Sequence, residues 1–376
     1  MKKNLYSLKT PSYVVDEKKL IDNLKILSEV AKEADCKILL AQKAFSMFAV
    51  YPLIGEYLTG TTASGLFEAK LGYEEMGKET HIFSAAYMDN EIDEIVKICD
   101  HMSFNSFSQW ERYGQKALAA GVSCGIRINP QHSTQGHDIY DPCAEGSRLG
   151  VIRKNFREDL LEGIEGLHFH TLCQQDSDAL IDTLAAVEEK FGQFIPQMKW
   201  INFGGGHHIT REDYHRQELV DCIKRFKEKY QVEVYLEPGE AIAYYGGYLV
   251  TSVLDIVNNG MDIAILDVSA ACHMPDVIEM PYRPPIWQSG KPQEKPYNYR
   301  LTGPTCLAGD IMGDYSFDQP LKIGDKIIFD DMAIYSMVKN NTFNGMCLPA
   351  IALQKVDGGT QIIREFGYED FKGRLS

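Results

Sequence analysis

The sequence lacks any excess of positive charge. Its 38 lysines and arginines stand against 53 aspartates and glutamates, which gives a formal net charge of −15. An acidic chain is poorly suited to bind nucleic acid or an anionic membrane surface, whereas its long-range field attracts cationic small molecules. We therefore expect a cationic small-molecule substrate, with no nucleic-acid partner and no membrane partner.

Long apolar runs and paired cysteines are also missing. The first residues have no apolar core of the length that a signal peptide needs, and no later run approaches a membrane span, so a cytoplasmic protein is expected. The nine cysteines are scattered, odd in number and without a Cys-x-x-Cys pair. This pattern favours reduced thiols over a disulfide framework or a structural zinc site.

What the sequence does contain is an alternation of short apolar runs with longer helical patterns. Eight strand-like runs separated by helical stretches predict a (β/α)8 barrel, with a doubly wound open sheet as the alternative. The helical stretch 178–191, for example, has apolar residues at helical spacing. The expected strands are 37–40, 58–63, 81–84, 101–105, 123–128, 164–170, 200–203 and 232–236.

The pattern changes after Glu237. Strand-like stretches are then separated by glycine and proline, with few helical patterns between them, which predicts a second domain made of β strands. These stretches are 244–257, 262–268, 326–329 and 350–355. We therefore expect an α/β protein in which residues 13–240 form the barrel. Residues 1–12 and 241–376 would form a β-sandwich or β-barrel-like domain.

Catalytic residues of such barrels lie at the C-terminal ends of the strands. Lys43 follows the first expected strand, and Gly204, Gly205 and Gly206 follow the seventh. A partly desolvated lysine could form a Schiff base with a carbonyl cofactor, or it could be an ordinary solvated loop residue. The glycines could close their amides around a phosphate or simply form a flexible turn.

Two histidines and a glutamate complete the candidates at the strand ends. His168 and His170 lie on one side of the sixth expected strand, where paired imidazoles could bind zinc. His207 and His208 are adjacent, however, and no Cys/His cluster completes a ligand set. His170 stacked on a cofactor ring, with Glu237 beside a pyridine nitrogen, explains more of the pattern. Pyridoxal phosphate is therefore favoured over a metal.

Long ordered motifs make the chain similar to one known family from Thr10 to Gly367. They are AQKAFSMF, GTTASGLFEAKLG, SRLG, EGLHFHTLC, INFGGGHHIT, YLEPGEA, HMPDVIEMPYRPP, GPTCLAGD and NTFNG. With them the chain resembles the fold-type III pyridoxal-phosphate decarboxylases, the group that includes ornithine and diaminopimelate decarboxylases. Its motifs are most similar to those of members that decarboxylate carboxynorspermidine or carboxyspermidine. The resemblance implies an alanine racemase-like barrel, a carboxy-lyase of polyamine biosynthesis and a homodimer with shared active sites.

The resemblance also implies a role for each matching residue. Lys43 matches the lysine bonded to pyridoxal phosphate, His170 the imidazole stacked on its ring, and Glu237 the partner of its pyridine nitrogen. Cys306 matches the thiol that returns a proton to the decarboxylated carbon, on a loop that enters the active site of the other subunit. The remaining implied cofactor-binding residues are Gly204, Gly205, Gly206, Gly239 and Tyr335.

The chain departs from ornithine decarboxylases in its substrate region. Leu307 stands where those enzymes have an acid after the cysteine, and Glu240 stands where they have an arginine. Residues 171–173 replace their Val-Gly-Ser. These departures favour a carboxylated polyamine, whose distal amines need carboxylate partners because cations bury poorly without them. The candidate substrate-binding residues are Asp276, Asp310, Glu240, Arg148 and His207.

Other functions stay open at this point. They are decarboxylation of ornithine, lysine or diaminopimelate, racemisation, non-catalytic carriage of pyridoxal phosphate and, remotely, metal-dependent hydrolysis on a barrel. Carboxynorspermidine and carboxyspermidine differ by one methylene, which is worth about 1–3 kcal/mol of discrimination in a pocket. Both therefore stay candidate substrates.

Overall fold

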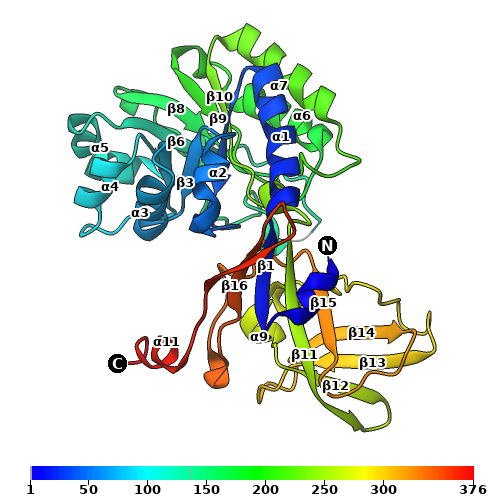
Figure 1. Cartoon of the computed structure of the whole chain (residues 1–376). Helices are drawn as coiled ribbons and strands as arrows, with labels where there is room; N and C mark the ends of the chain where they lie inside the picture. The colour runs from blue at the N-terminus through cyan, green and yellow to red at the C-terminus, as the bar shows by residue number, and fades with distance from the viewer. Residues whose placement is uncertain (1, 137) are drawn as a thin grey trace. The chain divides into compact units, whose positions relative to one another are not determined.

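A computed structural model describes residues 2–136 and 138–376 (Figure 1). The chain divides into two compact units. One, the barrel unit, is Asn23–Ile242, and the other, the sheet unit, combines Met1–Asp22 with Ala243–Ser376. Among the described residues, no helix is long and apolar enough to cross a membrane.

In the described residues of the barrel unit, eight parallel strands form the barrel. They are β2 (Lys37–Ala41), β3 (Gly60–Ala63), β4 (Glu79–Phe83), β5 (His101–Phe104), β6 (Ser123–Asn129), β8 (Ile164–His168), β9 (Trp200–Asn202) and β10 (Glu233–Leu236). Neighbours in this order pair with one another, and β10 pairs back with β2. This closure confirms the expected (β/α)8 barrel and excludes the open sheet. The short β7 (Val151–Ile152) pairs with β6.

Helices precede, connect or follow these strands. They are α1 (Glu17–Ala34), α2 (Tyr51–Gly55), α3 (Leu66–Glu75), α4 (Ile92–Ile98), α5 (Phe107–Ala119), α6 (Ser177–Phe191), α7 (Arg216–Tyr230) and α8 (Glu240–Ala243). The predicted stretch 178–191 is α6, which buries Leu180, Leu184 and Val187 at helical spacing. Ser106 begins α5 as its N-cap, because its side chain accepts a hydrogen bond from the Gln109 amide (3.2 Å).

Aromatic and imidazole rings fill the barrel at the N-terminal ends of its strands. His81 and His101 stack with ring centroids 4.0 Å apart, and the Trp200 ring lies 5.1 Å from His101. Gly125 and Gly166 leave room for this indole, since a Cβ at either position would lie 2.3 Å or 2.1 Å from an indole carbon. The two glycines are thus required by close packing.

The described residues of the sheet unit form eight strands and three short α-helices. The strands are β1 (Ser12–Asp16), β11 (Gly247–Asn258), β12 (Asp262–Leu266), β13 (Tyr297–Thr302), β14 (Ile311–Phe317), β15 (Lys326–Asp330), β16 (Ala350–Gln354) and β17 (Thr360–Arg364). Their order is β14-β13-β12-β11-β1-β16-β17, with β15 also paired to β11. The helices are α9 (Ala270–His273), α10 (Asp276–Glu279) and α11 (Tyr368–Lys372).

The N-terminal boundary of the sheet unit differs from the expected one. Strand β1 pairs antiparallel with β11 and parallel with β16, so residues beyond position 12 belong to this unit. The unit continues to Asp22, within α1. The apolar run that the sequence assigned to the barrel is therefore a central strand of the second sheet.

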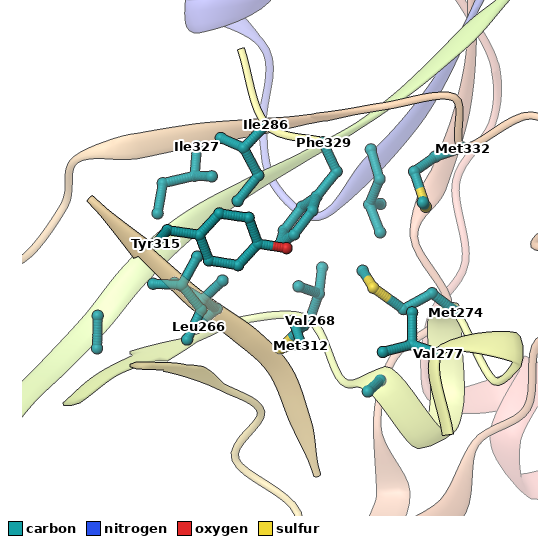
Figure 2. Packing of buried hydrophobic residues seen from close by; sticks show 14 of the residues in the cluster. Leu266, Val268, Met274, Val277, Ile286, Met312, Tyr315, Ile327, Phe329 and Met332 are labelled. Atoms are coloured by element: carbon teal, nitrogen blue, oxygen red, sulfur yellow. The ribbon is translucent and has the colours of Figure 1, made fainter. Parts of the chain in front are cut away.

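The core of the sheet unit is dominated by large apolar side chains (Figure 2). Tyr315 and Phe329 meet edge to face with ring centroids 6.5 Å apart, and Met274, Met312 and Met332 belong to the same cluster. The Tyr315 hydroxyl donates to a backbone carbonyl at 2.7 Å, so its polar end is satisfied inside the core. This packing holds the loops that carry the remaining candidate residues.

Candidate active site

A cavity opens at the C-terminal ends of the barrel strands. It measures about 360 Å³ when the space open to solvent at its mouth is included. Its lining comes from the ends of seven of the eight barrel strands or the loops that follow them: Ala41, Lys43, Thr62, Ala63, Ser64, Phe83, Arg127, His168, His170, Gly205 and Glu237. A larger hollow between α6 and α7 is lined almost entirely by charged side chains and contains no strand end. The first cavity is therefore the candidate active site.

Lys43 lies two residues beyond β2, and its side chain is exposed to the mouth of this cavity. The surrounding protein removes hydration from the ammonium, which lowers the pKa of Lys43, and the Arg127 guanidinium lowers it further. A lysine whose neutral form is favoured is a good nucleophile toward a carbonyl. The side chain therefore has the acid–base character that a Schiff base requires.

His170 is held uncharged in a fixed orientation. Its Nδ1 accepts the Gly205 amide at 2.8 Å, which places the ring proton on Nε2. Burial, followed by the charges of Lys43 and Arg127, holds the pKa of His170 well below its usual range. The strand ends at His168, so His170 is positioned by the loop and by Gly205 rather than by strand geometry.

Glu237 is an ionised carboxylate in the cavity wall. One of its oxygens accepts the Asn202 side-chain amide at 2.7 Å, and the other lies 3.7 Å from Nε2 of His168. Burial alone would raise the pKa of Glu237, but His168 and the hydrogen bond from Asn202 outweigh it, so the pKa is lowered. The carboxylate is thus able to stabilise a protonated ring nitrogen.

Arg127 and His168 also line the cavity, although neither is among the residues expected to hold the cofactor or the substrate. Arg127 is buried, donates to the His170 carbonyl at 3.2 Å and packs over the Phe83 ring at 4.4 Å. Burial lowers the pKa of Arg127 to about 10 and that of His168 to about 4. Arg127 lies near the end of the fifth expected strand, and in such barrels the catalytic residues come from these ends.

The glycine turn after β9 differs in detail from the expectation. The Gly204 amide donates to Asn202 Oδ1 and the Gly205 amide to His170 Nδ1, both at 2.8 Å. Gly204 and Gly206 have φ angles of 71° and 85°, and a Cβ at Gly206 would lie 2.0 Å from a backbone carbonyl oxygen. Two of the three amides are therefore engaged with protein acceptors, and the turn is glycine because it packs tightly.

The other candidates in the barrel unit lie outside the cavity lining. Gly239 packs against Ala44, where a Cβ would come within 2.6 Å. Glu240 accepts a hydrogen bond from the Gln174 side chain at 2.8 Å, and His207 is fully buried. Arg148 is exposed on the loop before β7. Because His207 is fully buried, it is suited to support the glycine turn rather than to touch the substrate.

The sheet unit carries the four remaining candidates. Cys306 is exposed, and Tyr335 is half-buried with a φ of 48°. Asp276 accepts a hydrogen bond from Lys339 at 2.5 Å, while burial raises the pKa of this carboxyl group. Asp310 is buried and saturated with hydrogen bonds from its own unit, including one from the Ala270 amide at 2.7 Å, so we no longer expect it to bind substrate amines.

A second cluster of ionisable groups lies at the opposite ends of the barrel strands. Glu79, His81 and His101 offer ligand atoms within 4.8 Å of one another. The Lys37 ammonium already contacts Glu79 at 2.8 Å, and His81 contacts the same carboxylate at 3.1 Å. Neither His168 nor His170 belongs to this cluster, so among the described residues the paired histidines considered from the sequence do not take part in it.

Comparison with known proteins places this geometry in a family. The family model "Pyridoxal-dependent decarboxylase, C-terminal sheet domain" matches residues 12–333. The chain belongs to the pyridoxal-dependent decarboxylases. Family membership confirms the expected fold, cofactor and carboxy-lyase activity, and it leaves no support for the metal-dependent hydrolase.

Two curated relatives of this pyridoxal-dependent decarboxylase match along almost the whole chain. The carboxynorspermidine/carboxyspermidine decarboxylase of Campylobacter jejuni subsp. jejuni serotype O:6 is 45% identical, with 98% of each chain covered. The carboxyaminopropylagmatine decarboxylase of Synechocystis sp. is 42% identical, with 99% of this chain and 96% of the relative covered.

A solved structure agrees with these matches. The crystal structure of carboxynorspermidine decarboxylase from Campylobacter jejuni, complexed with norspermidine, has a TM-score of 0.92 and 45% identity. The match covers 98% of this decarboxylase and 100% of that chain. Diaminopimelate decarboxylase from Helicobacter pylori, with a TM-score of 0.84 and 20% identity, shares the fold.

The cavity residues fit pyridoxal phosphate. An amine with a lowered pKa, a neutral imidazole and an ionised carboxylate face one space beside a tightly packed glycine turn. These are the groups needed to hold an aldehyde, cover an aromatic ring and pair with a pyridine nitrogen.

Proposed function

We propose that this enzyme decarboxylates a carboxylated polyamine, with carboxynorspermidine and carboxyspermidine as the first candidate substrates. The observation that carries the proposal is the 45% identity to the Campylobacter jejuni enzyme over 98% of both chains. The net charge of −15 adds an attraction for a substrate with several ammonium groups.

Three side chains of the barrel unit would hold the cofactor. Lys43 would bind its aldehyde, His170 would lie against its ring, and Glu237 would keep the ring nitrogen protonated. When bound, pyridoxal phosphate supplies an electron sink for the pair left behind as carbon dioxide departs. Because the amides of Gly204 and Gly205 are engaged, we assign the phosphate to Gly206, Gly239 and Tyr335.

The chain's own contribution is orientation and proton transfer. Glu237 is fixed by Asn202, and His170 is fixed by Gly205, so neither side chain has to reorganise during reaction. Cys306 would then give its thiol proton to the carbon that has lost carbon dioxide. Asp276 and Glu240 are the carboxylates that we propose for the distal amines of the substrate.

We also propose a homodimer in which the Cys306 loop of each subunit completes the site of the other. Sedimentation or light scattering should find a dimer, and mixing Lys43→Ala with Cys306→Ala subunits should restore activity through hybrid dimers. Failure of all mixtures to recover activity would remove the shared site. A cytoplasmic location stays a prediction.

A second candidate substrate should be included in the assay. Carboxyaminopropylagmatine is favoured by the 42% identity of the Synechocystis relative, which spans 99% of this chain. Its agmatine end differs from a polyamine's terminal amine by a planar, bidentate donor group. Asp276 and Glu240 would then have to accept paired hydrogen bonds from this planar group.

Carbon dioxide release by the cofactor-loaded enzyme tests the proposal. The panel is carboxynorspermidine, carboxyspermidine, carboxyaminopropylagmatine, ornithine, lysine and diaminopimelate. We expect kcat/KM to be highest for one of the first two. A preference for carboxyaminopropylagmatine would select the second candidate, and a preference for any of the last three would overturn the substrate assignment.

A further inference from the structure

Cys306 is exposed and lies on a loop that a hydrogen bond from another segment holds in place. The Cys306 backbone amide donates a hydrogen bond to Asn344 Oδ1 at 3.0 Å. The next residues in the loop, Leu307 and Gly309, are exposed, whereas Asp310 is buried. One side-chain contact from a distant part of the sequence therefore holds the residue that we propose as the proton donor.

Asn344 is suited to this contact by its backbone. It has φ 58° and ψ 18°, the left-handed region that asparagine tolerates better than most residues. Its segment is fixed in turn, because Asn341 Oδ1 accepts the Phe343 amide at 2.9 Å. The Asn341 side-chain amide also donates to the Ala271 carbonyl at 2.8 Å. The 341–345 segment is thus anchored to α9.

Asp310 fastens the other end of the same loop to the same helix. Its Oδ1 accepts the Ala270 amide at 2.7 Å and the Ser269 hydroxyl at 3.0 Å. Its Oδ2 accepts the Thr305 hydroxyl at 2.7 Å, one residue before Cys306. A Cβ on Gly303 would lie 2.2 Å from this oxygen, so the loop also packs tightly where it begins.

These contacts converge on one residue from two sides. Asp310 holds Thr305, and Asn344 holds the amide of Cys306. Asp310 is itself bonded to the start of α9, and the segment of Asn344 is bonded to α9 through Asn341. The thiol is therefore presented from a rigid platform even though it is exposed. A loop that moved freely would not keep these hydrogen bonds.

We propose that Asn344 and Asp310 are positioning residues for the proton transfer by Cys306, so that the proton reaches only one face of the substrate carbon. In this step the S–H bond breaks and a C–H bond forms with the electron pair left by carbon dioxide. The thiolate regains a proton from water before the next turnover. The inference rests on the proposed role of Cys306.

The decisive variants remove or keep the hydrogen-bond acceptor. Asn344→Gly loses the acceptor but tolerates the positive φ, whereas Asn344→Asp keeps an acceptor and also tolerates this conformation. Gln293→Gly is the matched control, because Gln293 is an exposed residue of the same unit with a φ of 66°. It removes a side chain at a left-handed position away from Cys306.

The first measurement needs no turnover. Hydrogen exchange of the Cys306 amide in the cofactor-loaded protein should be at least ten times faster in Asn344→Gly. The Asn344→Asp and Gln293→Gly proteins should match the wild type. Unchanged exchange in Asn344→Gly would overturn the proposed anchoring, whatever the activity of the enzyme.

The second measurement reads the direction of proton delivery. Reaction in D2O places one deuterium on the carbon that loses carbon dioxide, and its configuration can be determined in the amine product. Wild type, Asn344→Asp and Gln293→Gly should give a single configuration, and Asn344→Gly a mixture with at least a tenth of the opposite form. A single configuration from Asn344→Gly would remove its positioning role.

These outcomes separate the inference from the proposed function. A wild-type enzyme that releases no carbon dioxide from any carboxylated polyamine would contradict the function but leave the exchange result standing. A Cys306→Ala enzyme that still gives full yield in one configuration would overturn the role of the thiol, and the positioning inference with it.

Discussion

At the scale of single residues, the cavity gains its chemistry by removing water from charged groups. Lys43, His170 and Arg127 all have lowered pKa values, and the largest cause is the loss of hydration to the surrounding protein. The clustering of cations adds to the effect on Lys43 and His170. An amine with a lowered pKa and a neutral imidazole thus meet an ionised Glu237 in one space.

Lys43→Ala should abolish covalent cofactor binding. Borohydride reduction and peptide mass spectrometry should locate the wild-type adduct at position 43 and find none in the variant. Carbon dioxide release should fall by at least ~10³-fold, because covalent catalysis through this amine is lost. Lys326→Ala, in the sheet unit, is the control for a generic lysine change. An adduct on another lysine would contradict the assignment.

Glu237→Gln tests the carboxylate that faces the ring nitrogen. Glutamine keeps the shape and can still contact Asn202, but it cannot hold a proton on the nitrogen. We expect kcat to fall about 10²–10⁴-fold with little change in KM, by analogy with the loss of a positioned acid–base group. A shift in the absorbance of the bound cofactor should accompany the loss. A variant with wild-type kcat would exclude this role.

Asp310→Asn separates a structural carboxylate from a substrate ligand. The amide nitrogen replaces one carboxylate oxygen and cannot accept the hydrogen bonds that this oxygen now receives, so we expect unfolding to become easier by about 1–3 kcal/mol. Chemical denaturation measures this, with the exposed Asp318→Asn as a control that should cost little. A stable variant with a strongly raised KM would return Asp310 to the substrate site.

At the scale of secondary-structure elements, the sequence predicted the strands and helices that have a clear hydrophobic pattern. All eight barrel strands lie within or beside the expected runs, since a parallel strand buried on both faces reads as a short apolar run. Strands β13, β14 and β17 were missed because their sequences, such as YNYRLT, mix polar and apolar residues at a sheet of which one face is exposed.

The candidate site shows the same division. Lys43, His170 and Glu237 could be found because each follows a recognisable strand, and the cavity does bring them together. Arg127 and His168 lie on the strands themselves, where a polar residue resembles an ordinary interruption of an apolar run. The saturation of Asp310 depends on contacts with residues about forty positions away, which no local pattern reveals.

Gly166→Ala tests the packing of β6, β8 and β9. A Cβ at this position would lie 2.1 Å from a carbon of Trp200, so the indole or a strand must move. We expect a loss of about 1–3 kcal/mol in the free energy of unfolding, as for overpacked cores. Thermal denaturation measures it. Gly136→Ala, where nothing lies within 4 Å, should leave stability nearly unchanged.

At the scale of the whole molecule, buried neutral histidines link stability to pH. Burial lowers the pKa of His101 to about 3 and those of His168, His207 and His273 to about 4. In the unfolded chain each would titrate near ~6.5. As the pH falls below that value, the unfolded state binds protons at these histidines and the folded state does not. The free energy of unfolding therefore decreases.

Denaturation curves between pH 8 and pH 5 should therefore show a steady loss of stability on acidification. His101→Phe should make this loss smaller, because one refused proton is removed while the stacked ring next to His81 is kept. Glu79 does not contribute in this range, because its pKa of about 2, where burial is outweighed by His81 and Lys37, lets its contribution fade only below about pH 4.5. Equal pH dependence in both proteins would contradict the assignment to His101.

The pairing of β1 carries a consequence for synthesis of the protein. Ser12 to Val15 pair with Gly247 to Val250, and Ser12 to Asp16 pair with Ala350 to Gln354. On the ribosome, the barrel residues emerge completely before either neighbour of this buried apolar strand exists. The nascent chain therefore carries an apolar strand without its pairing partners for most of translation. Premature termination after the barrel would leave this strand exposed to aggregation or to binding by chaperones.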